Sequence, residues 1–327
     1  MPSVDPNRPV SRRQALALSG GVVGGLLVSG CGRASASRDR GNPSGAPVGA
    51  PQSGSLPRAQ MEKILDAQAD VSEGLIHFSI NRTDARAVRG PQRVPFSGSF
   101  EINGDLYFQP LDRGKSAFFN GDLALKPAEL NTVIDAIIDN GLVFQAMHQH
   151  YFGLKPMWWF IHIRGRGDPL KLAQAMRNVL AATSTPFPQK APVSPASPLS
   201  VKQLEQILRG NGTVGDEGVV TVDVPRTDKV TIDGVRVNPG ANISTNIQFR
   251  PLTGAATAAA APDFSMTSAE IMPVTSLMRR LGWRDHCLYN QETGEDPQLY
   301  FSHMLKVGEP YTLAREIRQG LDRTAVK

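Results

Sequence analysis

An internal repeat constrains the fold of this chain more than any other feature of its sequence. Residues 141–180 align without a gap with residues 282–321, at a constant offset of 141. Further upstream, and with small gaps, Arg82-Thr83-Asp84 corresponds to Arg226-Thr227-Asp228. The repeat is much longer than the roughly 20–50 residues of a solenoid unit. It is therefore a whole domain that is present twice.

The repeat also sets the domain organisation of the 327 residues. We expect a first copy at residues 56–182 and a second copy at residues 199–327. Between them, residues 183–198 are rich in Pro, Ser and Ala, which is typical of a linker. The chain is 40% hydrophobic and 20% charged, which provides a core for each copy and excludes a wholly disordered protein.

Each copy has the same expected order of elements. In the first copy, Met61, Ile64 and Leu65 share one face of a short opening helix. Strand and turn signals then alternate with two more helical patterns, the first of which ends at Asn140-Gly141. The expected strands are residues 74–81, 96–108, 116–123, 142–150 and 157–164, and the expected later helices are residues 127–140 and 169–180. This order predicts an α+β fold, with a mainly antiparallel sheet and packed helices in each of two copies related by a pseudo-two-fold.

The first 31 residues have the features of an export signal. Arg12 and Arg13 precede an apolar, Gly-rich run at residues 15–30, which is too short and too weakly apolar for a transmembrane helix. The paired arginines resemble a twin-arginine signal, and the general secretory route stays open as an alternative. Cys31 follows Val28-Ser29-Gly30, which resembles the lipobox of bacterial lipoproteins. We therefore expect an exported protein that faces the extracytoplasmic side and is anchored to the cell membrane by a lipid on Cys31.

The segment after the lipobox has the composition of a flexible tether. Residues 32–55 consist mostly of Gly, Ser, Ala and Pro, so they cannot bury enough apolar area to offset the entropy of the chain. The only other cysteine is Cys287. Once Cys31 is acylated, the chain has no partner left for an intrachain disulfide.

The distribution of charge argues against nucleic acid as a partner. The formal net charge is +5, but residues 1–31 and residues 32–55 each contribute two of these positive charges. Residues 56–327 are left with a net charge of +1. A nucleic-acid interface needs clustered Lys and Arg on the folded domain itself.

Histidines on two neighbouring strands of the first copy suggest a metal site. His148 and His150 are two residues apart on an expected strand, so both side chains leave the same face of the sheet. His162 lies on the next strand and reaches that face only if the register of the pair allows it. Imidazoles grouped in this way bind divalent transition metals such as zinc. Because Tyr289 and Gln291 replace His148 and His150 in the second copy, we expect any metal site to lie in the first copy.

Several functions are compatible with these residues. The first is binding of a small ligand or a metal through the histidines, without catalysis. The second is a metal-dependent hydrolase of the envelope, in which Glu129 is the general base. The third is a scaffold, in which the histidines are buried core residues and Glu129 is a carboxylate favoured at a helix start.

A string of residues across the first copy resembles a known family. Gly121-Asp122, Glu129, His148-Gln149-His150, His162 and Gly167-Asp168 are similar to the motifs of the bacterial lipoprotein family named for mycobacterial LppY and LpqO. The resemblance covers both copies, although the family's triplet often reads His-Asn-His. It implies an exported lipoprotein, and it implies no specific chemistry because the family has no established activity.

Overall fold

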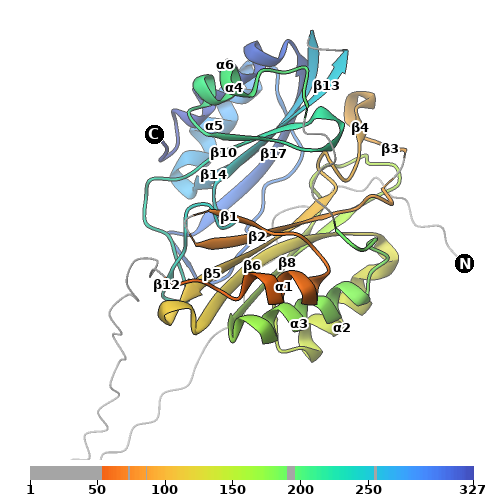
Figure 1. Ribbon diagram of the computed structural model, residues 1–327. Coiled ribbons are helices and arrows are strands. Elements are labelled where there is room, and N and C mark those ends of the chain that lie inside the picture. Colours follow the sequence, from red (N-terminus) through yellow and green to blue (C-terminus); the bar gives the residue numbers. More distant parts are fainter. Residues whose placement is uncertain (1–53, 73, 86, 190–195, 254–255) are drawn as a thin grey trace, which may run out of the picture. The chain divides into compact units, whose positions relative to one another are not determined.

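The computed structural model describes residues 54–72, 74–85, 87–189, 196–253 and 256–327, which belong to one compact unit (Figure 1). The predicted export signal with Arg12, Arg13 and Cys31, and nearly all of the predicted tether, lie outside the described residues. So does the middle of the predicted linker, residues 190–195.

The first copy folds into one six-stranded sheet with three helices. Its strand order is β1-β2-β5-β6-β8-β7, and every neighbouring pair is antiparallel. The strands are β1 (Asp70–Ser72), β2 (Leu75–Asn81), β5 (Asn103–Leu111), β6 (Ser116–Leu125), β7 (Val143–His148) and β8 (Trp159–Gly167). The helices are α1 (Arg58–Leu65), α2 (Leu130–Asp139) and α3 (Pro169–Ala181), and the short strands β3 (Val88–Arg89) and β4 (Pro95–Phe96) form a separate hairpin.

The second copy repeats this topology. Its sheet has the order β9-β10-β13-β14-β17-β15, which matches the first sheet strand for strand. The strands are β9 (Asn211–Val214), β10 (Val220–Val224), β13 (Thr245–Thr253), β14 (Thr257–Thr267), β15 (Arg284–Asp285) and β17 (Leu299–Gly308). The helices are α4 (Val201–Leu208), α5 (Ser268–Arg280) and α6 (Pro310–Leu321), and β11 (Thr231–Ile232), β12 (Val235–Arg236) and β16 (Glu295–Asp296) form a small third sheet. The predicted α+β fold in two tandem copies is confirmed.

The two sheets face each other, and the helices lie outside them. In Figure 1, α1, α2 and α3 cover the outer face of the first sheet, and α4, α5 and α6 cover the outer face of the second. Strand β5 shows how the sequence specifies this arrangement. Leu106 and Phe108 point into the core under the helices, while the alternate residues Asp105 and Tyr107 point to the opposite face. The faces that meet between the copies therefore carry many polar side chains.

Apolar clusters hold the copies together on both sides of this polar region. One cluster packs Phe100 and Tyr151 of the first copy against Leu305 of the second. The other packs Phe118 of the first copy against Phe301 of the second. Burial of such large apolar side chains contributes about 25 cal/mol for each Å² removed from water. The contact between the copies is thus a second core, interrupted by polar groups.

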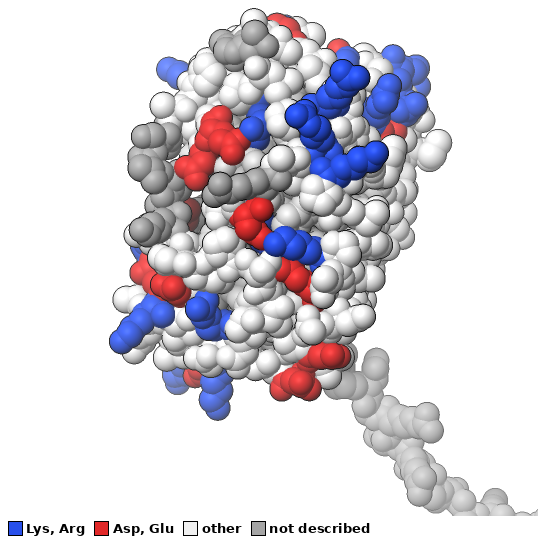
Figure 2. All heavy atoms as spheres, turned by 90° about the vertical axis from the view of Figure 1, so that its right-hand side faces the viewer, with Lys and Arg blue, Asp and Glu red and all other residues white. Residues whose placement is uncertain are grey.

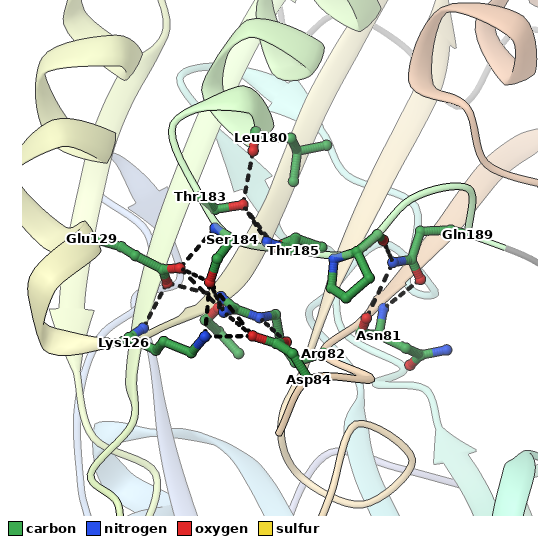
Figure 3. Close-up of polar contacts among 12 residues, drawn as sticks. Asn81, Arg82, Asp84, Lys126, Glu129, Leu180, Thr183, Ser184, Thr185 and Gln189 are labelled. Carbon is green, nitrogen blue, oxygen red and sulfur yellow. Dashed lines mark hydrogen bonds and ion pairs between the residues drawn. The ribbon is translucent and has the colours of Figure 1, made fainter. Parts of the chain in front are cut away.

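The start of the predicted linker packs against the first copy. Gln189 accepts a hydrogen bond from the backbone N–H of Asn81 at 2.9 Å and donates one to its carbonyl at 3.1 Å (Figure 3). The N–H of Ser184 donates to a Glu129 oxygen at 2.8 Å, as the N–H of Ala325 does to Glu270 in the second copy. The residues near Ser184 are therefore part of the folded first copy, as those near Ala325 are part of the second.

The surface carries charges of both signs. Figure 2 shows Lys and Arg side chains gathered mainly in the upper part of one face, with Asp and Glu among and below them. Among the described residues, no helix has the length and apolar character needed to cross a membrane.

Candidate metal centre between the two copies

A polar cavity lies between the facing sheets. Its volume is about 60 Å³. The first copy lines it with Glu101, Asn103, Asp105, Tyr107, Asp122, His150 and His162. The second copy lines it with Asp223, Asn242, Ser244, Asn246, Gln248, Asp263, Tyr289, Gln291, Phe301 and His303.

Three of these side chains form a ligand set for a metal ion. One oxygen of Glu101 and one ring nitrogen each of His150 and His303 lie within 4.8 Å of one another. Glu101 Oε2 is 3.4 Å from His303 Nδ1 and 3.8 Å from His150 Nδ1. Ligands around a tetrahedral zinc ion are separated by about 3.3 Å, given bond lengths of about 2.0–2.1 Å. A small inward movement would bring all three atoms to one ion.

The ring nitrogens of this group lack other partners. Among the described residues, His150 Nδ1 and His303 Nδ1 are buried and have no hydrogen-bond partner. A buried polar atom without a partner costs about 1–3 kcal/mol, which coordination of a metal would recover. Two histidines and one carboxylate are ligands that zinc and iron(II) accept, and they leave a coordination position open.

Each ligand comes from a different element. Glu101 precedes β5 and has φ of 67°, a left-handed conformation that is uncommon outside glycine. Its N–H donates to Gln248 Oε1 of the second copy at 3.0 Å, which fixes the residue in this conformation. His150 lies just beyond the end of β7, and His303 lies within β17. Strain of this kind is typical of functional sites, where the surrounding structure maintains it.

Asp263 supports His303 from behind. The two residues are paired across β14 and β17, and Asp263 Oδ2 is 3.6 Å from His303 Nε2. Burial lowers the pKa of His303, but the carboxylates of Asp263 and Glu101 outweigh that effect and raise it. Burial raises the pKa of Asp263 to about 6, although His303 opposes this. A carboxylate behind a histidine is the usual support of a metal-bound imidazole.

The other two predicted histidines lie beside this group as a pair. His148 Nε2 is 2.9 Å from His162 Nε2, a distance that fits one N–H donating to the other ring. The strand register pairs Ala146 with His162 and His148 with Phe160, which places His162 on the predicted face. Burial lowers the pKa of His162 to about 3, helped by His303, and lowers that of His148 well below its usual value. Both rings are therefore neutral at pH 7.

Glu129 is in a separate cluster (Figure 3). One of its oxygens is 2.9 Å from Arg82 Nη1, and it also accepts the N–H of Lys126 at 2.7 Å. Burial raises the pKa of Glu129, but hydrogen bonds from Arg82, Ser184 and the backbone lower it to about 2. The structure therefore groups Glu129 with Arg82 and not with the histidines.

The second copy repeats this ion pair. Arg226 Nη1 is 3.0 Å from Glu270 Oε2, which also accepts the N–H of Thr267 at 2.7 Å. Because both copies keep the pair, its role is to fix the start of α2 and of α5.

The candidate metal group spans both copies, whereas the sequence led us to expect a site in the first copy alone. His303 belongs to the second copy, and Glu101 is held by Gln248 of that copy. His303 had a sequence signal, since it recurs at the position of His162. Glu101 had none, because it belongs to no motif and lies between β4 and β5, inside the single strand expected at residues 96–108.

The internal repeat relates the metal group to a second set of residues in the same cavity. Glu101 corresponds to Asn242 and His150 to Gln291, at the offset of 141. Asn242 has φ of 60°, close to the value of Glu101. His162 corresponds to His303, and it is paired with Asp122 across β6 and β8 as His303 is with Asp263. We call Glu101, His150 and His303 the metal end, and Asn242, Gln291 and His162 the amide end.

Comparison with known proteins identifies the family of this chain, but it does not indicate an activity. The crystal structure of EtuB from Clostridium kluyveri matches over 79% of this chain and 91% of its own, with 9% identity and a TM-score of 0.19, too low to support any inference. No curated protein matches the chain at a significant level. The model of the family described as Domain of Unknown Function (DUF1259) matches residues 59–182 and residues 202–323. The chain therefore belongs to this family, DUF1529, and carries its domain twice.

Proposed function

We propose that the protein binds one divalent transition metal ion, such as zinc, between its two copies. The observation that carries this proposal is the metal end, where Glu101, His150 and His303 bring three ligand atoms within 4.8 Å. The two ring nitrogens have no other partner among the described residues. Buried atoms of this kind are rare without a ligand.

The ligand set leaves room for chemistry at the ion. A bound ion would polarise a ligand at its open position. Glu101, His150 and His303 would hold the ion, and Asp263 would fix the orientation of His303. A hydrolytic role would need a base other than Glu129, because Arg82 already holds that carboxylate. Binding of a metal together with a small ligand is therefore the function that we favour.

Metal content of the purified full-length chain tests this proposal. We expect close to one equivalent of zinc after dialysis at about pH 7, where binding of the ion displaces any proton from the histidine ligands. H150A should abolish this content. H148A is the matched control, because His148 bonds to His162 and supplies no ligand atom to the metal end. Equal zinc content in H150A and the wild type would refute the proposal, as would an absence of zinc from both.

We also propose that the protein acts outside the cytoplasm as a lipoprotein of the LppY and LpqO type. The paired arginines, the apolar run and the lipobox-like Val28-Ser29-Gly30-Cys31 support this proposal. In a bacterial host that modifies lipoproteins, the wild type should incorporate labelled palmitate and sediment with membranes. C31A should lose the label, whereas C287A should keep it. Equal labelling of wild type and C31A would contradict lipidation at Cys31.

A further inference from the structure

We propose that the cavity between the copies binds a small, neutral, hydroxyl-bearing molecule, which meets the metal ion at one end and the amide end at the other. This inference rests on the proposed metal site and specifies its ligand. It gives a role to Asn242, Gln291 and His162, which lie in the cavity but outside the metal group.

The size of the cavity limits the ligand. A buried water needs about 10–15 Å³ of cavity volume, so 60 Å³ corresponds to about four to six waters. A diol, a triol or one edge of a sugar ring fits this space, whereas a whole nucleotide does not. The side chain of Asp263 keeps 18% exposure, so the metal end is in contact with solvent.

The charge of the lining excludes anions. Carboxyl groups of Glu101, Asp105, Asp122, Asp223 and Asp263 line the cavity, and none of its described lining residues is Lys or Arg. Phosphate or a carboxylate at the open coordination position would therefore face like charges at short range.

Unpartnered polar atoms at both ends favour hydroxyl groups in particular. His162 is only 2% exposed, and its Nδ1 has no hydrogen-bond partner among the described residues. Among the described residues, Asn242 Nδ2, a donor, and Asp263 Oδ1, an acceptor, also have no hydrogen-bond partner. A hydroxyl both donates and accepts, so a molecule with two or three hydroxyls satisfies all of these atoms.

Cobalt-loaded full-length protein tests the inference, with glycerol and inorganic phosphate as probes. The visible absorption of bound cobalt reports any change at the open coordination position. We expect glycerol to change this spectrum at concentrations at least about tenfold below those at which phosphate does. In N242G we expect glycerol to bind about 3- to 10-fold more weakly, the loss of one hydrogen bond. Glycine keeps the left-handed conformation of position 242, and one bound cobalt shows that the variant is folded.

N211G is the matched control, because Asn211 is exposed in β9 and does not line the cavity. It should bind glycerol as the wild type does. The inference is wrong if cobalt binds but glycerol leaves its spectrum unchanged, if phosphate binds as tightly as glycerol, or if N242G and N211G behave alike. If cobalt itself does not bind, the proposed metal site fails and this inference fails with it.

Discussion

The metal end and the amide end of the cavity have the same backbone and different chemistry. Glu101 and Asn242 both adopt a left-handed conformation, with φ of 67° and 60°. Behind each end stands an aspartate paired with a histidine on adjacent strands. The groups that could hold an ion differ, since a carboxylate and an imidazole at the metal end become amides at the other. Both ends of the cavity thus keep the same backbone conformation and the same aspartate–histidine pair. Only the metal end has a carboxylate and a second imidazole that could hold an ion.

Residues that serve the fold behave differently in this comparison. The ion pair of Arg82 and Glu129 in the first copy recurs as Arg226 and Glu270 in the second. Each copy is therefore an internal control for the other. A side chain that both copies keep in the same contacts stabilises the domain, and a side chain that only one copy keeps is a candidate for function.

The largest effect is expected from breaking a shared structural pair. E129Q leaves Arg82 with Asp84 as its remaining charged partner, and loss of one carboxylate from a buried ion-pair network costs up to about 3–5 kcal/mol. Chemical denaturation should show this loss in the free energy of unfolding, with E270Q showing a loss of similar size. Both variants should still bind one metal ion below their unfolding transitions. Loss of metal from a folded E129Q would place Glu129 in the site after all.

The next largest effect separates the two equivalent histidines. H303A should weaken zinc binding by more than about 100-fold, because even residues that only support a ligand contribute about 10- to 100-fold. H162A should retain one equivalent of zinc. Competition with a chromophoric chelator measures both affinities. Equal losses in the two variants would show that the ends are not distinct.

A smaller effect tests whether the amide end is a metal site without its ligands. Replacing Asn242 by Glu and Gln291 by His rebuilds the ligand set around His162. We expect a second equivalent of zinc, bound at least about tenfold more weakly than the first, because one ring nitrogen of His162 is already bonded to His148. Titration calorimetry gives the stoichiometry. The single variant N242E is the control and should stay at one equivalent, and a double variant that also stays there would break the structural equivalence.

The smallest effect concerns the residue that follows His150 at the metal end and Gln291 at the amide end. This residue is Tyr151 in the first copy and Glu292 in the second. Burial raises the pKa of Glu292 to about 8, although Arg164 opposes this. This pKa is above the ordinary value of 4.5 for a glutamate. Between pH 4.5 and about pH 8, Glu292 is therefore protonated in the folded state and ionised in the unfolded state. The free energy of unfolding falls as pH rises through this window. The slope contributed by this group is at most about 1.4 kcal/mol per pH unit.

E292Q removes the titrating group and keeps the shape of the side chain. Thermal unfolding should therefore be less dependent on pH in E292Q than in the wild type, with the gain in stability largest at the alkaline end. D135N is the control, because Asp135 is exposed on the surface of α2. Identical pH profiles for E292Q and the wild type would contradict the expected ionisation.

The sequence predicts the fold of this protein better than it predicts the site. The duplication, the order of strands and the helix starts follow from periodicity and from local signals such as Asp168 before Pro169, whose carboxylate caps α3. His148 and His150 were expected on one face, with His162 joining them only if the register allowed it, and the structure brings the three rings together. The meeting of His150 with His303 could not be predicted, because it depends on which faces of the two sheets pack together. Glu101 could not be predicted either, since its left-handed backbone depends on Gln248 of the other copy.

The covalent linkage of the two copies has an evolutionary consequence. In a dimer of identical chains, a substitution appears in both subunits at once, and the two-fold symmetry makes every shared cavity the same at both ends. In a tandem duplication each copy accumulates substitutions separately, while the linker keeps the partners at high effective concentration. A single chain can then present a cation to one side of a bound molecule and hydrogen-bonding amides to the other. The tandem duplication therefore allows the two ends of one cavity to carry different chemical groups.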